Sequence, residues 1–115
     1  MLNLTILTPC RNEQDNVRRV SERIAAVMTG IPGVTYQHLF IDNASSDHTV
    51  AGLRALAKEN PRVRVIVNQR NFGHVRSPYH GLLQAEGDAV IVLAADLQDP
   101  PELIPEFIRL WQDGF

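Results

Sequence analysis

Apolar residues recur along the chain in two alternating patterns, one typical of strands and one typical of helices. Short runs rich in β-branched residues predict strands at residues 4–8, 36–41, 63–67 and 89–94. Apolar residues spaced three and four apart predict helices at residues 17–28, 47–57, 74–86 and 99–111. This alternation predicts an α/β fold, a Rossmann-like parallel sheet with helices on both faces.

Several residues carry more detailed predictions about the strands. Pro9 has no N–H group, and we expect it to end the first strand. The run from Ala89 to Ala94 is apolar on both faces, which predicts a central strand of the sheet. His38 falls within a predicted strand, so we expect it to have a structural role.

Other residues predict how the helices begin and what they bury. Asp47 is placed to cap the second helix. Asp99 with Glu102 resembles a capping box, in which Pro100 would occupy the first helical position. The apolar spacing predicts that the last helix buries Leu103, Ile104, Phe107, Ile108 and Trp111.

Composition narrows the class of protein. The 115 residues allow one domain, and a formal net charge of −2 argues against a general nucleic-acid binder. No apolar run approaches the roughly 20 residues of a membrane-spanning helix, and no charged leader precedes the first strand. Cys10 is the single cysteine, which favours a reducing compartment. We therefore expect a cytoplasmic protein.

Acidic residues follow three of the predicted strands. Glu13, Asp42 and Asp96 would meet at one edge of the sheet, where parallel α/β sheets bind their ligands. Carboxylates there can accept hydrogen bonds from ribose hydroxyls or bind a hard cation. Glu13 would also suit the dipole of a helix's first turn. Asp96 has no such structural explanation, because it follows a buried strand and does not begin the next helix.

Several function classes lack their sequence signatures. The chain has no G-x-G-x-x-G after its first strand, no P-loop and no G-x-S-x-G elbow. The four histidines and Cys10 lack zinc-ligand spacing. A receiver-like signalling domain would place paired acids after the first strand and a lysine after the last. The only lysine is Lys58, in the middle of the chain, which disfavours that class.

Four segments, in order, resemble family 2 glycosyltransferases with a GT-A fold, nearest to the dolichyl-phosphate mannosyltransferase-like and polyprenyl-phosphate sugar transferases. They are ILTPCRNE (6–13), IDNASSDHT (41–49), RNFG (70–73) followed by Gly81-Leu82 and Gly87-Asp88, and AADLQDPPELI (94–104). The resemblance implies that the chain is the N-terminal, donor-binding half of such a domain. It implies transfer of a sugar from a nucleotide-diphosphate sugar to a glycan or polyprenyl-phosphate acceptor.

The same resemblance implies roles for individual residues. Glu13 would accept hydrogen bonds from ribose hydroxyls, Asp42 would contact the nucleobase, and Asp96 would bind Mg²⁺ or Mn²⁺ together with Gln98. The donor pocket as a whole would comprise Pro9, Arg11, Glu13, Asp42, Asn43, Arg70 and Asp96. A catalytic base would lie beyond residue 115, so none is assigned. We expect the 115 residues alone not to turn over.

Two departures from the family pattern leave an alternative open. Ala94 stands where the first aspartate of the D-x-D motif is expected, and Asn43 replaces a second acid after the second strand. Both reduce negative charge at the predicted site, so a non-catalytic nucleotide-binding module is the alternative function. Any membrane attachment, at the cytoplasmic face, would come from other parts of a full-length protein.

Overall fold

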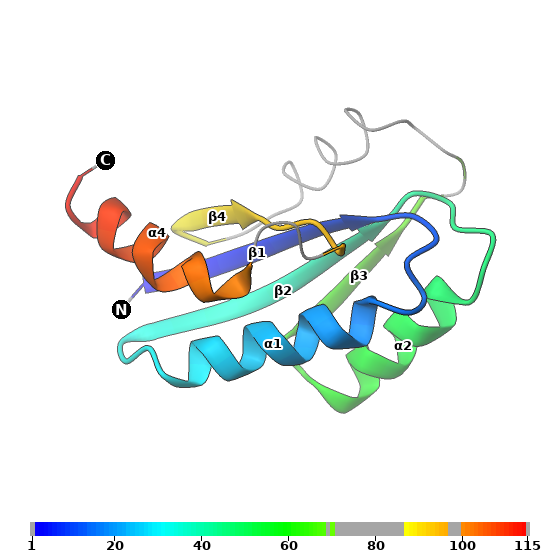
Figure 1. Cartoon of the computed structure of the whole chain (residues 1–115), viewed down its shortest axis with the longest axis horizontal. Helices are drawn as coiled ribbons and strands as arrows, with labels where there is room; N and C mark the ends of the chain where they lie inside the picture. The colour runs from blue at the N-terminus through cyan, green and yellow to red at the C-terminus, as the bar shows by residue number, and fades with distance from the viewer. Residues whose placement is uncertain (1, 69, 71–86, 97–99, 115) are drawn as a thin grey trace.

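The computed structural model describes all residues except 1, 69, 71–86, 97–99 and 115, and shows a parallel sheet packed against helices (Figure 1). The sheet order is β3-β2-β1-β4 with every pair parallel, which confirms the predicted α/β sheet. The elements are β1 (Leu2–Cys10), α1 (Val17–Thr29), β2 (Val34–Asp42), α2 (Thr49–Glu59), β3 (Val63–Val67), β4 (Ala89–Val92), the 3₁₀ turn η1 (Pro101–Leu103) and α4 (Ile104–Gln112).

The inner strands of the described sheet are β1 and β2, whereas the apolar run at 89–94 predicted that the strand there is central. Pairing with β2 runs along all of β1, from Leu2 opposite Val34 to Cys10 opposite Asp42. β4 is shorter than predicted, lies outermost among the described strands and pairs only with Leu4–Leu7. Among the described strands β4 therefore lies at the edge of the sheet and not at its centre, because hydrophobicity reports which faces are apolar and not which strand lies alongside.

Pro9 does not end β1, contrary to the sequence-based expectation. Cys10 O accepts a hydrogen bond on the β2 side, and Leu7 O accepts one from Leu93 N on the β4 side. Since alternate residues of a parallel strand bond to opposite neighbours, the nitrogen of Pro9 faces the β4 side. It lies there beyond Leu7, the last residue that pairs with β4, so no ladder hydrogen bond is lost.

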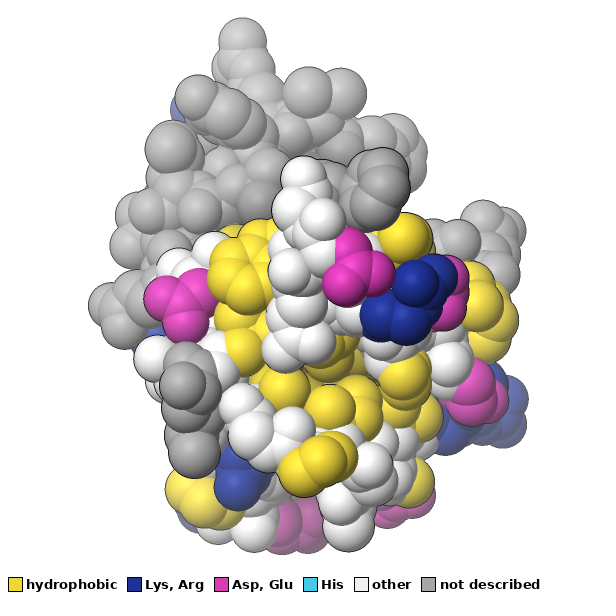
Figure 2. Space-filling view, turned by 90° about the vertical axis from the view of Figure 1, so that its left-hand side faces the viewer, with side chains coloured by type: hydrophobic (Ala, Val, Ile, Leu, Met, Phe, Trp, Pro, Cys, Tyr) yellow, Lys and Arg dark blue, Asp and Glu magenta, His cyan; other side chains and the backbone are white. Residues whose placement is uncertain are grey.

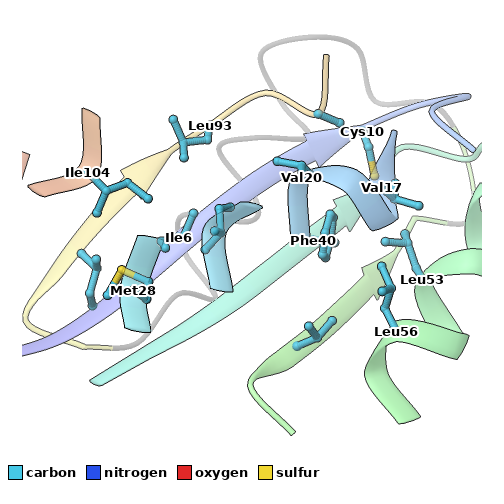
Figure 3. Close-up of a cluster of buried hydrophobic side chains, with 14 of the residues drawn as sticks. Ile6, Cys10, Val17, Val20, Met28, Phe40, Leu53, Leu56, Leu93 and Ile104 are labelled. Carbon is cyan, nitrogen blue, oxygen red and sulfur yellow. The ribbon is translucent and has the colours of Figure 1, made fainter. Parts of the chain in front are cut away.

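One buried cluster joins the described helices to the sheet (Figure 3). Ile6 of β1 and Phe40 of β2 share it with apolar side chains of three helices, namely Val17, Val20, Ile24 and Met28 of α1, Leu53 and Leu56 of α2, and Ile104 and Ile108 of α4. On the opposite face Leu7, Leu39 and Ile41 form a second cluster. The helix predicted at 74–86, which would cover that face, lies outside the described residues.

The entry into β4 is fixed by a close backbone approach. Asp88 N donates to Asn3 O at 2.8 Å, and Asn3 N donates to a carboxylate oxygen of Asp88 at 2.9 Å. Gly87 has φ +114°, and a Cβ there would lie 2.8 Å from Asn3 O, so only glycine fits. These two hydrogen bonds set the register of β4 against β1. The carboxyl end of β4 therefore lies beside the carboxyl end of β1.

The last helix buries only part of its predicted apolar face. Ile104 and Ile108 are buried, but Leu103, Phe107 and Trp111 are each nearly half exposed, so the prediction was wrong for these three. Leu103 and Phe107 each precede a core residue by one position, and Trp111 continues their spacing of four, so the three lie on the flank of the face that Ile104 and Ile108 bury. Figure 2 shows the side of the molecule that is on the left in Figure 1, where α4 lies.

The start of this last helical segment also differs from the prediction. Pro101, and not Pro100, takes the first position of η1. Glu102 forms an ion pair with Arg23 of α1, so its carboxylate bonds across to a neighbouring helix. The predicted partner in the capping box, Asp99, lies outside the described residues.

Candidate functional site

Backbone hydrogen bonds continue past the carboxyl ends of the strands and bring the following loops together. Asn43 N donates to Cys10 O at 2.9 Å, and Asn68 N donates to Asp42 O at 2.8 Å. Leu93 N donates to Leu7 O at 2.9 Å. The loops after β1, β2, β3 and β4 therefore leave the sheet from one edge, where an open α/β sheet binds ligands.

Asp42, at the end of β2, is 0% exposed. One carboxylate oxygen accepts the backbone N–H of Ser45 at 2.9 Å, and the other accepts the Ser45 hydroxyl at 2.5 Å. The Asp42 side chain thus bonds the residue three positions further along and folds its own loop. The predicted contact of Asp42 with a nucleobase stays a prediction, while its hydrogen bonds show that it shapes the loop after β2.

The loops after β1 and β2 are joined by side-chain hydrogen bonds. The partners are 33 to 36 residues apart in sequence, and all lie between a strand and a helix except Thr49, which begins α2. The bonds through a backbone N–H are Asn12 N to Ser45 Oγ at 2.8 Å, Ser46 N to Asn12 Oδ1 at 2.8 Å, Glu13 N to Thr49 Oγ1 at 2.9 Å, and His48 N to Gln14 Oε1 at 3.0 Å. Sequence reasoning missed these contacts, although Asn12 and Ser45 lie inside the two quoted motifs.

Asp47 lies one residue before the N-cap of α2, which corrects the prediction that it caps this helix. Its Oδ1 accepts the backbone N–H of Thr49, the first residue of the helix, at 2.9 Å, and also bonds the Thr49 hydroxyl. Desolvation opposes ionisation of this group, but the hydrogen bonds from Thr49 hold the pKa of Asp47 below its ordinary value. The helix begins two residues after Asp47, with His48 at the N-cap position.

Glu13 lies before α1 and not in its first turn, which corrects the expectation from the sequence. Its backbone carbonyl accepts hydrogen bonds from Asn16 N at 2.9 Å and Val17 N at 3.1 Å, and this turn leads into the helix. Its side chain is half-buried, with Oε2 accepting from Asn16 Nδ2 at 2.8 Å. The carboxylate is therefore held in the loop after β1, at the edge of the sheet.

Two buried asparagines meet where β2 and β3 end. Asn68 Nδ2 donates to Asn43 Oδ1 at 3.3 Å. Asn43 was a predicted donor-binding residue, whereas Asn68 was not. Asn68 could have been found from its position directly after the third strand, because the same rule selected the acidic residues.

Asp96 is exposed in the turn that follows β4, after the half-buried Ala94 and the buried Ala95. The predicted metal ligand Gln98 lies outside the described residues. In the part of the chain that the structure describes, no three His, Cys, Asp or Glu side chains form a group that could hold a metal ion. A cation at this edge would therefore take one carboxylate, that of Asp96, from the described turn.

The other predicted donor-binding residues also lie on these loops. Pro9 is half-buried at the end of β1, and Arg11 is exposed two residues further along. Arg70 is exposed after β3. The structure thus places Pro9 and Arg11 on the joined loops, and Arg70 two residues beyond Asn68.

Cys10 and His38 are buried and have structural roles. Burial raises the pKa of the Cys10 thiol, and the Asp42 charge raises it further, which excludes a reactive thiolate. His38 is stacked on Phe40 with ring centroids 4.0 Å apart, and its Nε2 lies 2.7 Å from Thr8 Oγ1. Burial lowers the pKa of His38 to about 3, so the ring is neutral in the folded state, as expected for a structural residue.

A hollow lies near the amino end of β1, away from the loops described above. It has a volume of about 310 Å³ and is formed by β1, β4 and α4, with Leu2, Leu4, Ala89, Val90, Ile91, Phe107, Ile108, Leu110 and Trp111 around it. Hydrophobic side chains gather on this face of the molecule (Figure 2). The lining offers no acid, base or nucleophile, so the chemistry is expected at the carboxyl edge. Among the described helices, none is long and apolar enough to cross a membrane.

Comparisons with known proteins place this fold and these loops in a family. The chain is 37% identical over 114 residues to the uncharacterized glycosyltransferase YkcC of Bacillus subtilis (strain 168), covering 99% of this chain and 35% of that protein. It is 33% identical over 113 residues to an undecaprenyl-phosphate 4-deoxy-4-formamido-L-arabinose transferase of Edwardsiella ictaluri, covering 97% of this chain and 34% of that protein. The chain thus spans about a third of the length of these curated relatives.

Solved structures show the same fold. The mannosyltransferase PcManGT from Pyrobaculum calidifontis, in complex with GDP-Man and Mn²⁺, superposes with a TM-score of 0.70 at 20% identity. That match covers 84% of this chain and 32% of the mannosyltransferase. The sheet and its helices are therefore part of a GT-A fold. The family model for glycosyl transferase family 2 matches residues 5–115, and the chain belongs to that family.

Proposed function

We propose that this chain supplies the donor-binding half of a glycosyltransferase that moves a sugar from a nucleotide-diphosphate sugar to a lipid-phosphate or glycan acceptor. The observation that carries the proposal is the joining of the loops after β1 and β2 at the carboxyl edge of the sheet. Hydrogen bonds fix these loops, so their polar groups are held in place before a ligand binds. Such preorganisation lowers the cost of ordering a site on binding.

The donor would be held by residues of both loops. The half-buried carboxylate of Glu13 suits the ribose hydroxyls, because an ionised carboxylate is an acceptor that can take two donors. Asp42, which also holds Ser45, would contact the nucleobase, and the neighbouring Asn43 would line the same pocket. The exposed guanidinium groups of Arg11 and Arg70 would contribute positive charge toward the diphosphate.

A divalent cation fits the residues at the end of β4. Mg²⁺ is commonly bound through one or two carboxylates together with substrate phosphates, so the single described carboxylate of Asp96 is sufficient when a diphosphate is present. Gln98 would add a neutral oxygen ligand. When bound, the cation would supply Lewis-acid stabilisation of the charge on the departing nucleoside diphosphate. The Mn²⁺ bound by the mannosyltransferase of the same fold supports a cation of this class.

The acceptor is proposed from the relatives. The arabinose transferase that resembles this chain acts, by its name, on undecaprenyl phosphate. A polyprenyl phosphate is therefore the first acceptor to test, with a glycan as the second. The described residues include no candidate for the base that would activate it, so we assign none.

The experiment that tests this proposal is calorimetric titration of UDP-, GDP- and dTDP-sugars with and without Mn²⁺. We expect one nucleotide sugar to bind only in the presence of Mn²⁺. In Asp96→Ala, affinity in Mn²⁺ should fall at least about tenfold, since the cation loses its carboxylate. Asp113→Ala removes an equally exposed carboxylate at the end of α4 and should bind like wild type. Unchanged Mn²⁺-dependent affinity in Asp96→Ala would reject the metal assignment.

The alternative, a nucleotide-binding module without transfer, rests on Ala94 and Asn43, which lower the charge of the site. Such a module would bind UDP or GDP as tightly as the sugar donor and without dependence on Mn²⁺. The same titration therefore separates the two functions. Binding of no nucleotide at all would contradict both.

A further inference from the structure

Asn12 forms a two-way contact between the loops after β1 and β2. Its backbone N–H donates to Ser45 Oγ at 2.8 Å, and its side-chain Oδ1 accepts the backbone N–H of Ser46 at 2.8 Å. The Ser46 hydroxyl lies 3.3 Å from the same Oδ1. Asn12 thus bonds to the opposite loop through both its own backbone N–H and its own side-chain oxygen. We call this set of bonds the Asn12 clasp.

The clasp continues into the buried end of β2. Ser45 Oγ, which accepts from Asn12, donates to the buried Asp42 carboxylate at 2.5 Å. The Ser45 backbone N–H donates to the other oxygen of Asp42 at 2.9 Å. A chain of hydrogen bonds therefore runs from a fully buried carboxylate to the exposed loop after β1.

The backbone at the clasp adopts an uncommon conformation on both sides. Asn12 has φ 55° and Ala44 has φ 57°, both in the left-handed region. Asparagine visits this region readily, but alanine does so at a cost of roughly 1–2 kcal/mol. Such conformations persist only where surrounding contacts hold them, and the hydrogen bonds of the clasp are those contacts.

We propose that Asn12 is a positioning residue of the donor site. It would fix Arg11 and Glu13, its neighbours in the loop after β1, relative to Asn43 in the loop after β2. This inference rests on the proposed function, because positioning has meaning only for a ligand that both loops bind. Asn12 itself contacts Ser45 and Ser46, so it acts through the loops and without touching the reacting atoms.

Three substitutions separate the parts of the clasp. Asn12→Gly keeps the left-handed backbone but removes Oδ1, and Asn12→Asp keeps an acceptor at the same place. Ser45→Ala removes the hydroxyl between Asn12 and Asp42 from the other loop. Asn60→Ala is the matched control, because Asn60 Oδ1 accepts the N–H of Arg62 at 3.0 Å, a similar contact outside these loops.

The test is titration of UDP-glucose and GDP-mannose in Mn²⁺, with the melting temperature of each variant measured alongside. We expect Asn12→Gly and Ser45→Ala to weaken the bound nucleotide sugar by about tenfold or more, since the loops must then be ordered on binding. Asn12→Asp should restore affinity to within about threefold of wild type at high salt, which screens the added charge. Asn60→Ala should bind like wild type.

Amide hydrogen exchange without nucleotide provides the second measurement. Exchange at Ser46 N should quicken in Asn12→Gly and return toward the wild-type rate in Asn12→Asp. Wild-type affinity in a folded Asn12→Gly would overturn the positioning role and leave the proposed function standing. If Asn12→Gly does not fold, wild-type affinity in folded Ser45→Ala would overturn it equally. If the wild-type chain binds neither nucleotide sugar, the proposed function fails, and this inference fails with it.

Discussion

The two strands beside β1 differ in how their polar groups are used. β2 pairs with β1 along its whole length, and every residue from His38 to Asp42 is buried. β4 pairs with four residues of β1, and Val90 and Val92 of β4 are 37% and 45% exposed. At the end of β2 the carboxylate of Asp42 is turned into its own loop, whereas at the end of β4 the carboxylate of Asp96 is exposed.

This difference shows that a carboxylate after a strand can have either of two roles. Burial of an ionised group is tolerated only when hydrogen bonds replace its water, and Ser45 supplies them to Asp42. An exposed carboxylate lies within reach of a cation from solvent. We therefore expect substitution of Asp42 to change stability, and substitution of Asp96 to change ligand binding.

The largest expected effect comes from Asp42→Ala. The substitution leaves the Ser45 N–H and hydroxyl without their buried acceptor, so the free energy of unfolding should fall by about 2–4 kcal/mol. Urea denaturation measures it. Asp96→Ala is the comparison at the other strand and should change stability by less than about 0.5 kcal/mol. Equal losses in the two variants would remove the distinction between the strands.

A smaller effect is expected from acidification, through His38 of β2. Because the pKa of this ring falls from 6.5 to about 3 on folding, the unfolded chain binds more protons below pH 6.5. Stability is then lost as the pH falls, by about 2 kcal/mol between pH 7 and pH 5. Urea midpoints measured over this range check it. In His38→Gln no group titrates at this position, so its stability should depend on pH less steeply than that of the wild type. Equal slopes of stability against pH in the two proteins would refute the assignment to His38.

The smallest effect is expected from Trp111 of α4, the helix beside β4. Trp111 is nearly half exposed, so Trp111→Ala should lower the free energy of unfolding by less than about 1 kcal/mol. Ile104 on the same helix is fully buried, and Ile104→Ala should cost about 3 kcal/mol. Thermal or urea unfolding of both variants compares them. A larger loss for Trp111→Ala than for Ile104→Ala would contradict the observed packing of this helix.

Much of the fold could be predicted from the pattern of apolar residues. The apolar spacing in 17–28 marked the face of α1 that packs on the sheet, and residues 63–67 matched β3 to the residue. These predictions succeeded because a helix or strand with one apolar face has few ways to bury it. For α4 the same reasoning failed, because an apolar stripe wider than the core contact does not reveal which residues enter the core.

The candidate site was predictable in outline but not in its contacts. The rule that ligands bind at the carboxyl edge selected Glu13, Asp42 and Asp96, and the structure places Asp42 at the end of β2 and the other two in loops at that edge. It could not show that Asp42 is buried and bonded to Ser45, or that Asn12 and Asn68 belong to the same structure. Those contacts join residues far apart in sequence, so local patterns carry no information about them.

From the sequence alone came the succession of the described strands and helices along the chain and, through four motifs, the family to which the chain belongs. Local propensities and apolar periodicity suffice for the first, because they depend on neighbouring residues only. The packing of distant segments was needed to show that β1 lies between β2 and β4, that Asp42 is buried while Asp96 is exposed, and that Asn12 holds two loops together. Burial and long-range hydrogen bonds arise when distant segments pack, and these determine which of several similar polar residues meets solvent.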